Sequence, residues 1–147
     1  MHKLKYIVLL MLVFIVSCST VKDSGKNNNY NSNIVAPGYC RIKGTIVNID
    51  STLEQGNSPC SKEPCLAVVH VDSILGYGAG FGTINNGSDI NLKFEFTLGP
   101  TTKELFPNIT ERLPGLNINS QFIANIKRYS ESGSKEKKYL VYGYKKL

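Results

Sequence analysis

One stretch, Ser88–Leu98, constrains the fold of this chain more than any other. Its apolar residues alternate strictly with polar ones. A period of two is typical of a β-strand with one buried and one solvated face, because a helix would scatter the same residues over opposite sides. The sequence therefore predicts a small β domain in which other strands cover the apolar face of this central strand. The apolar set is Ile90, Leu92, Phe94, Phe96 and Leu98.

Length and composition agree with a single β domain. The 147 residues suffice for one domain and its end segments. Tyr, Val, Ile, Asn and Gly are plentiful and Trp is absent, which favours strands and turns. Without Lys3 and Lys5 of the expected leader, 15 basic residues face 11 acidic ones, so the net charge falls from +6 to +4. This mild surplus is no argument for nucleic acid as a partner.

The N-terminal residues 1–17 are predicted to be a signal peptide. A short basic start precedes an apolar run, Tyr6–Val16, that is too short for a comfortable membrane span. The following Ile15-Val16-Ser17-Cys18 resembles the lipobox of bacterial lipoproteins. The resemblance implies cleavage before Cys18, a thioether bond from its sulfur to diacylglycerol, and acylation of the new amine, for example by palmitate. A plain secretory peptide with a chance cysteine is the alternative.

Lipidation at Cys18 implies a lipid-anchored protein of the bacterial cell envelope. Two or more acyl chains, at about 0.8 kcal/mol per buried CH₂, make a stable membrane anchor. Ser19, rather than Asp, follows the cysteine and indicates the outer membrane. The polar stretch after it has little to bury, so residues 18–37 are predicted to be a disordered tether. The folded domain is expected over residues 38–147.

Four further stretches predict strands around the central one. In Tyr39–Ile49 the apolar residues change parity beside Gly44, which indicates a bulge or a sharp bend. One helical turn is expected at Thr101–Phe106, before Pro107. The remaining predicted strands are Cys65–Leu75, Gln121–Tyr129 and Tyr139–Tyr144.

Five strands, a bent first strand and a helical insert between strands three and four fit the OB-fold, a partly open Greek-key barrel. The predicted fold class is all-β, a small five-stranded OB-like Greek-key barrel with a short helical turn. A plain five- or six-stranded barrel or sandwich is the alternative. About 110 residues are enough for such a domain to fold alone.

One run of turn residues carries a family resemblance. G-Y-G-A-G-F-G, then S-D-I-N-L-K-F-E-F-T-L-G-P-T-T-K-E-L-F-P-N and L-P-G-L, resembles small uncharacterised bacterial envelope lipoproteins with an OB-like domain. The resemblance covers Cys65–Ile126 and rests on spacing and turn residues rather than on a catalytic motif. It implies no activity, so it assigns no functional residue.

Cys60 and Cys65 are candidates for a disulfide, because thiols outside the cytoplasm tend to pair. The short loop between them would contribute roughly 2 kcal/mol by the chain-entropy argument. Two free thiols or half of a metal site are the alternatives, although no histidine flanks the pair and a structural zinc site needs four ligands. Cys40 begins the first strand, at the opposite end of the sheet from Cys65, and is predicted to be a small buried residue.

No set of residues predicts catalysis. His70 is the one histidine of the mature chain and lies in mid-strand, where a structural or surface role is expected. The acidic residues show no spacing that implies a carboxylate dyad. Gly76–Gly82 is no dinucleotide or phosphate loop, since no helix follows and no Lys-Ser/Thr closes it. We therefore expect no enzyme activity, metal or cofactor.

Two sets of residues are candidates for a binding surface. Gly76–Gly82 is predicted to be a flexible hairpin that displays Tyr77 and Phe81. A basic and aromatic rim around the last hairpin suits single-stranded nucleic acid or an acidic glycan, and a solvated hairpin tip is the alternative. A lipid anchor outside the cytoplasm disfavours nucleic acid. The rim comprises Lys127, Arg128, Tyr129, Lys135, Lys137, Lys138 and Tyr139.

The sequence thus predicts an envelope lipoprotein whose barrel binds a ligand or a protein. A structural or accessory subunit of an envelope complex is the alternative, and a hydrolase built around His70 or Cys40 is a third. An OB-fold presents its ligand surface across strands two and three, between the first and last loops. These loops are Asp50–Pro64 and Ser130–Lys138. Since the second carries the lysines, an acidic glycan or anionic lipid headgroup is the expected partner, with an envelope protein or peptide as alternatives.

Overall fold

The computed structural model describes Tyr30 and residues 34–130 and 138–147. The predicted signal peptide, Cys18 and most of the predicted tether lie outside the described residues, as do Lys135 and Lys137. One 3₁₀ turn and five strands are present in the described part: β1 (Tyr39–Asp50), η2 (Pro59–Ser61), β2 (Leu66–Tyr77), β3 (Asp89–Phe94), β4 (Gln121–Tyr129) and β5 (Lys138–Lys146).

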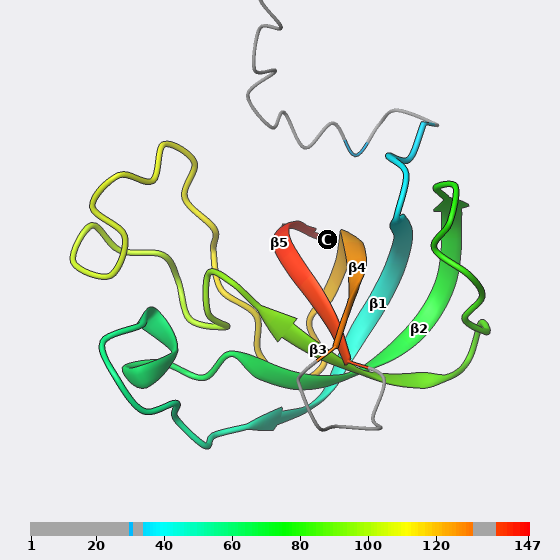
Figure 1. The fold of residues 1–147 in the computed structure, drawn as a ribbon. Helices are drawn as coiled ribbons and strands as arrows, with labels where there is room; N and C mark the ends of the chain where they lie inside the picture. The colour runs from blue at the N-terminus through cyan, green and yellow to red at the C-terminus, as the bar shows by residue number, and fades with distance from the viewer. Residues whose placement is uncertain (1–29, 31–33, 131–137) are drawn as a thin grey trace, which may run out of the picture.

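The five strands close a barrel in the order β1-β2-β3-β5-β4, and β4 pairs with β1 to complete the ring (Figure 1). Four of the neighbouring pairs are antiparallel, and β3 runs parallel to β5. A small five-stranded Greek-key barrel is the architecture of the OB-fold. The predicted OB-like fold is confirmed, and a plain sandwich is excluded.

β1 bends so that it can pair with two neighbours. Its residues Tyr39–Thr45 pair with β4, and the stretch from Cys40 to Asp50 pairs with β2. The β1–β2 register shifts at three places, one of them between Lys43 and Gly44. A Cβ at Gly44 would lie 2.7 Å from Cγ1 of Val69 and 3.1 Å from the carbonyl oxygen of His70. The predicted bend beside Gly44 is confirmed, and its cause is the close approach of β2.

The predicted central strand is shorter than its sequence pattern. β3 ends at Phe94, and Thr97 adopts the left-handed region with φ 61°. The chain after Phe94 forms a turn, not a strand, although Leu98 is still buried as the alternation predicts. The N–H of Leu98 donates to the carbonyl of Pro64 at 2.8 Å. Phe96 packs edge-on against Phe106, with their ring centroids 5.4 Å apart.

The helical turn predicted at Thr101–Phe106 forms only one α-type hydrogen bond. The N–H of Phe106 donates to the carbonyl of Thr102 at 2.9 Å, and Oγ1 of Thr102 accepts from Leu105 at 3.3 Å. The chain there forms turns rather than a helix. Pro107 stops the helix from continuing, because proline has no N–H to donate.

Aromatic rings fill the barrel. Phe94, Phe122 and Tyr144 pack edge-to-face with centroids 5.8 to 6.2 Å apart, the geometry that aromatic quadrupoles favour. Aliphatic side chains from the inner faces of the strands surround these rings. The fully buried ones include Ile42, Ile46, Val69, Val71, Leu92, Ile126 and Val141.

The N-terminal segment packs against the end of β2. The N–H of Gly38 donates to the carbonyl of Ala79 at 2.7 Å, and a Cβ at Gly76 would lie 2.9 Å from Cγ2 of Val35. Nη2 of the buried Arg41 donates to the carbonyl of Ile34 at 3.4 Å. Contacts with the barrel therefore begin before residue 38, the predicted start of the domain.

Gly44→Ala should destabilise the barrel by about 1 to 3 kcal/mol, because the new methyl must displace Val69 or the β2 backbone. Urea unfolding of residues 19–147 measures this loss. Val47→Ala, at a bulge residue whose side chain is 46% exposed, is the control and should change the free energy of unfolding by about 0.5 kcal/mol or less. Equal stability of the two variants would contradict the packing argument.

Candidate functional site

The outer face of β1, β2 and β3 carries side chains in three rows. Each row runs across the three strands, because residues paired in register point to the same side of the sheet. The middle row places two carboxamides on either side of an aliphatic residue. The rows are Asp50–Leu66–Lys93, Asn48–Val68–Asn91 and Thr45–His70–Asp89.

Two of these rows line a groove of about 440 Å³. The half-buried side chains of Leu66 and Val68 form its floor. Polar groups surround the floor, and Lys138 at the start of β5 lies at one edge of the groove. The groove lies across β2 and β3, where the ligand surface was expected from the sequence, and it includes Asp50 and Ser51 from the first predicted loop and Lys138 from the last. The polar residues that line it are Asn48, Asp50, Ser51, Asn91, Lys93 and Lys138.

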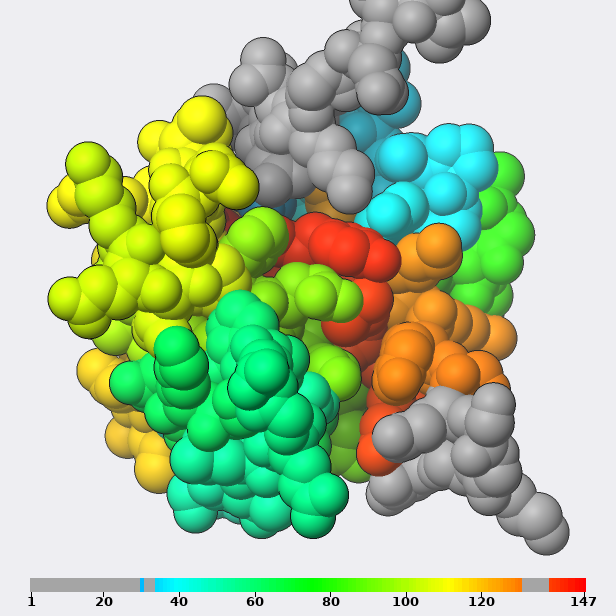
Figure 2. All heavy atoms as spheres, turned by 60° about the vertical axis from the view of Figure 1, so that its left-hand side comes forward, coloured from blue at the N-terminus to red at the C-terminus, as the bar shows by residue number. Residues whose placement is uncertain are grey.

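An ion pair links the groove to the loop that follows β1. Nζ of Lys93 lies 2.6 Å from Oε1 of Glu54, and this hydrogen bond raises the pKa of Lys93. Ser58 donates to the other carboxylate oxygen of Glu54 at 3.4 Å, and the N–H of Glu54 donates to the carbonyl of Cys60 at 2.9 Å. In Figure 2 this loop, coloured teal to green, stands forward on the surface below the yellow segment that follows β3.

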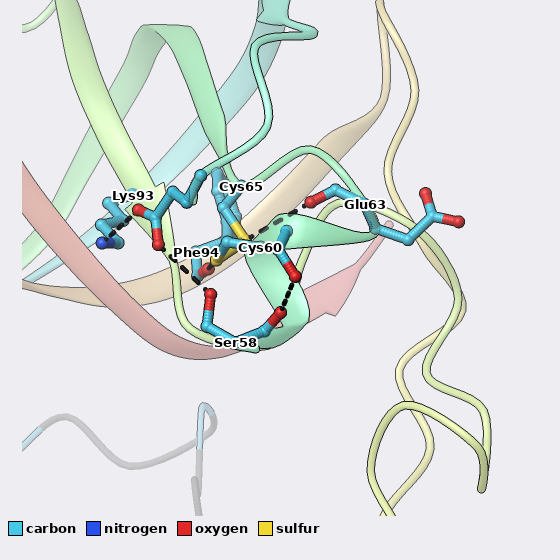
Figure 3. The surroundings of a disulfide bond; sticks show 8 residues. Ser58, Cys60, Glu63, Cys65, Lys93 and Phe94 are labelled. Carbon is cyan, nitrogen blue, oxygen red and sulfur yellow. Dashed lines mark hydrogen bonds and ion pairs between the residues drawn. A yellow bond between two sulfur atoms is a disulfide. The ribbon is translucent and has the colours of Figure 1, made fainter. Parts of the chain in front are cut away.

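A disulfide between Cys60 and Cys65 fixes the far end of the same loop (Figure 3). Both half-cystines are buried, and their Cα atoms lie 5.4 Å apart. The carbonyl of Cys65 accepts from the N–H of Phe94 at 2.8 Å, which ties the bridge to the end of β3. The pair that the sequence singled out therefore forms a cross-link in the structure, next to the strand that carries Lys93.

His70 and Cys40 do not come together. Nδ1 of His70 lies 2.7 Å from Oδ1 of Asp89, and both side chains are about half exposed on the outer face. Cys40 is fully buried inside the barrel, where burial raises the pKa of its thiol to about 11. No three His, Cys, Asp or Glu side chains of the described residues are placed to hold a metal ion.

The structure separates the predicted basic and aromatic rim. Lys127 and Arg128 are exposed, and the guanidinium carbon of Arg128 lies 5.6 Å from the ring centroid of Phe81. Tyr129 is half-buried, with Nζ of Lys93 5.9 Å from its ring centroid. Of the described rim residues, Tyr129 and Lys138 therefore lie closest to the groove.

Two aromatic residues predicted at the surface belong to the core. Phe81 is 2% exposed and Tyr139 is 3% exposed, and their rings stack with centroids 5.9 Å apart. Gly80 and Gly82 cause the first error, because their positive φ angles turn the chain so that Phe81 points inward. Tyr139 shares the inward parity of Val141 on β5, which explains the second error.

Tyr77 stays at the surface, but it is held rather than displayed on a flexible hairpin. Its ring is about half exposed, and its hydroxyl donates to the carbonyl of Ile84 at 2.8 Å. Gly78, beside it, donates its N–H to the carbonyl of Tyr39 at 2.7 Å. The glycines of this segment thus allow close packing against the N-terminal segment.

The sequence analysis missed most of the groove residues. Asn91 and Lys93 lie on the polar side of the predicted central strand, and Val68 has the same parity as His70, so their outward direction was readable. The register that places Asn48 beside Val68 could not be predicted from the sequence, because it depends on a bulge between Ile46 and Asn48.

Comparison with known proteins gives no relative to guide assignment. No protein-family model, curated protein or solved structure matches this chain at a significant level. Within the described residues, no helix has the length and apolar character needed to cross a membrane. Assignment of a function therefore depends on the chemistry of the groove and on the sequence of the predicted leader.

Protein isolated from its native compartment should contain the Cys60–Cys65 bridge. Trypsin cleaves after Lys62, so the bridge will hold two peptides together in mass spectrometry until a reductant is added. Cys40 should react with an alkylating reagent only after denaturation, because it is buried. Alkylation of Cys60 and Cys65 without reductant would rule out the bridge. Replacing both by Ala should cost about 2 kcal/mol of stability.

Proposed function

We propose that this chain is a lipid-anchored lipoprotein of the bacterial cell envelope, of the outer membrane by its sorting residue, and that its barrel holds a ligand in the groove. One observation carries the ligand-binding part: a groove of about 440 Å³ lies on the face that OB-folds use for ligands. Its volume falls in the range of small-molecule sites. Its polar groups converge on an aliphatic floor, as in sites that orient a ligand by hydrogen bonds.

The sequence supports the location. Cys18 closes the lipobox-like run, and the polar residues after it separate the anchor from the barrel. A buried disulfide fits an oxidising compartment. Together these features favour a barrel held at a membrane surface and exposed to extracytoplasmic ligands.

The predicted preference for an anionic partner depends on charges around the groove rather than in it. Asp50 and Glu54 offset Lys93 and Lys138 at the groove itself. Attraction of an acidic glycan or headgroup would therefore come from Lys127 and Arg128 and, outside the described residues, from Lys135 and Lys137. Such exposed charges act mostly on the association rate, and salt screens them over about 10 Å at 0.1 M.

Cys18→Ala should abolish lipidation. The variant should accumulate as an unprocessed precursor and incorporate no labelled fatty acid, because the sulfur that accepts diacylglycerol is gone. Gel mobility and label incorporation in the native host measure both effects, with Cys40→Ala as the control that keeps normal processing. Normal labelling of the Cys18 variant would sink the proposal of a lipid anchor.

Val68→Glu should abolish ligand binding, because it places a charge on the floor of the groove. Ile123→Glu is the matched control, since Ile123 is also a half-buried aliphatic residue on an outward position, but on β4. Binding of residues 19–147 to a panel of envelope glycans and anionic phospholipid vesicles is measured for both. If the wild type binds no member of the panel, the accessory-subunit alternative moves ahead.

A further inference from the structure

The charged groups of the groove are already balanced. Lys93 donates to Glu54 at 2.6 Å, so the carboxylate of Glu54 already offsets the positive charge that would attract a ligand carboxylate or phosphate. Asp50 lines the same wall as an exposed carboxylate and would repel an anion. The groove is therefore better suited to an uncharged ligand than to an acidic one.

Two carboxamides define the centre of the groove. Asn48 on β1 and Asn91 on β3 flank Val68, and neighbouring strands lie about 4.8 Å apart, so their Cα atoms are about 10 Å apart. A carboxamide carries two N–H donors and one carbonyl acceptor. Asn91 already has an interaction of its own. Asn48 is exposed, and its side chain makes no hydrogen bond to another described residue. Its N–H donors and carbonyl acceptor can therefore bind a ligand without first breaking a hydrogen bond to another described residue.

An acetamido group matches this row of side chains. Its N–H and carbonyl can form two hydrogen bonds with one asparagine carboxamide, while its methyl group packs on Val68 or Leu66. The hydroxyl groups of a sugar ring, which both donate and accept, would meet Ser51 and Asp50 along the same wall. Tyr129, beside Lys138 in the β4–β5 register, offers an aromatic ring next to the groove.

Two other ligand classes fit less well. A peptide shares the amide chemistry, but strand addition is closed to it here, since β2 pairs on both sides over Leu66–His70 and β3 pairs with both β2 and β5. An acyl chain needs an apolar cavity, whereas polar side chains surround a floor of two aliphatic residues and aromatic rings fill the barrel interior.

We propose that the groove binds an uncharged glycan that carries N-acetylated amino sugars, with the carboxamide of Asn48 recognising the acetamido group. This inference rests on the proposed ligand-binding function and names the ligand class of the same site. Binding should depend on hydrogen bonds in the groove, so its affinity should change little with salt.

Calorimetric titration of residues 19–147 tests the inference with two matched oligosaccharides. Tetra-N-acetylchitotetraose and cellotetraose share their linkage and differ in the acetamido group. We expect the first to bind at least about tenfold more tightly, the effect of losing one or two hydrogen bonds. Asn48→Leu should remove that preference without unfolding the chain, because Asn48 is exposed. Asn108→Leu, at an exposed asparagine outside the groove, is the control.

The outcomes distinguish recognition of the acetamido group from ligand binding in the groove. Equal affinity for both oligosaccharides, or unchanged affinity in Asn48→Leu, overturns recognition of the acetamido group. Tighter binding of an oligogalacturonate, of phosphatidylglycerol vesicles or of N-acetylated tetra-alanine amide, abolished by Val68→Glu, overturns the uncharged, N-acetylated glycan as the ligand class but keeps ligand binding in the groove. Failure of every probe to bind overturns the inference together with the proposed ligand-binding function.

Discussion

The fold depends on β1 serving two neighbours at once. The barrel closes because β1 pairs with β2 from Cys40 to Asp50 and also pairs with β4 along its first half. A regular strand would keep one parity and could not follow that curvature, so β1 shifts register three times. Gly44 leaves the space that lets β2 cross close to it. The inward side chains Ile42 and Ile46 then belong to the same buried core as the aromatic rings.

The same bends create the groove. In an unbroken strand Asn48 would share the inward parity of Ile46, and the bulge between them turns it outward beside Val68. The loop that follows is fixed at both ends, by Glu54 on Lys93 and by the disulfide beside Phe94. The bridge therefore also ties the loop that carries Glu54 to the end of β3. Reducing it should loosen that loop before it unfolds the barrel.

The strands and the barrel could be predicted because each depends on local pattern. Gln121–Tyr129 has the bounds that its alternation indicates, and the parity change beside Gly44 marks a real bend. The errors arise where local pattern gives no direction. The glycines around Phe81 indicate a turn but not whether the Phe81 side chain points inward or outward. The alternation of apolar and polar residues continues past Phe94, where the strand ends. The site depends on the register between strands that are distant in sequence. The outward direction of single residues could therefore be predicted, but not which of them lie side by side.

The central claim is that the outer face of β1, β2 and β3 is the ligand face. Amide chemical shifts of isotopically labelled residues 19–147, followed during titration with tetra-N-acetylchitotetraose, test it most directly. The account predicts that the largest shift changes fall on residues 48–54, 66–70 and 89–93. Changes centred on Tyr77–Gly82 or on the outer face of β4, or the lack of any change at saturating ligand, would contradict it.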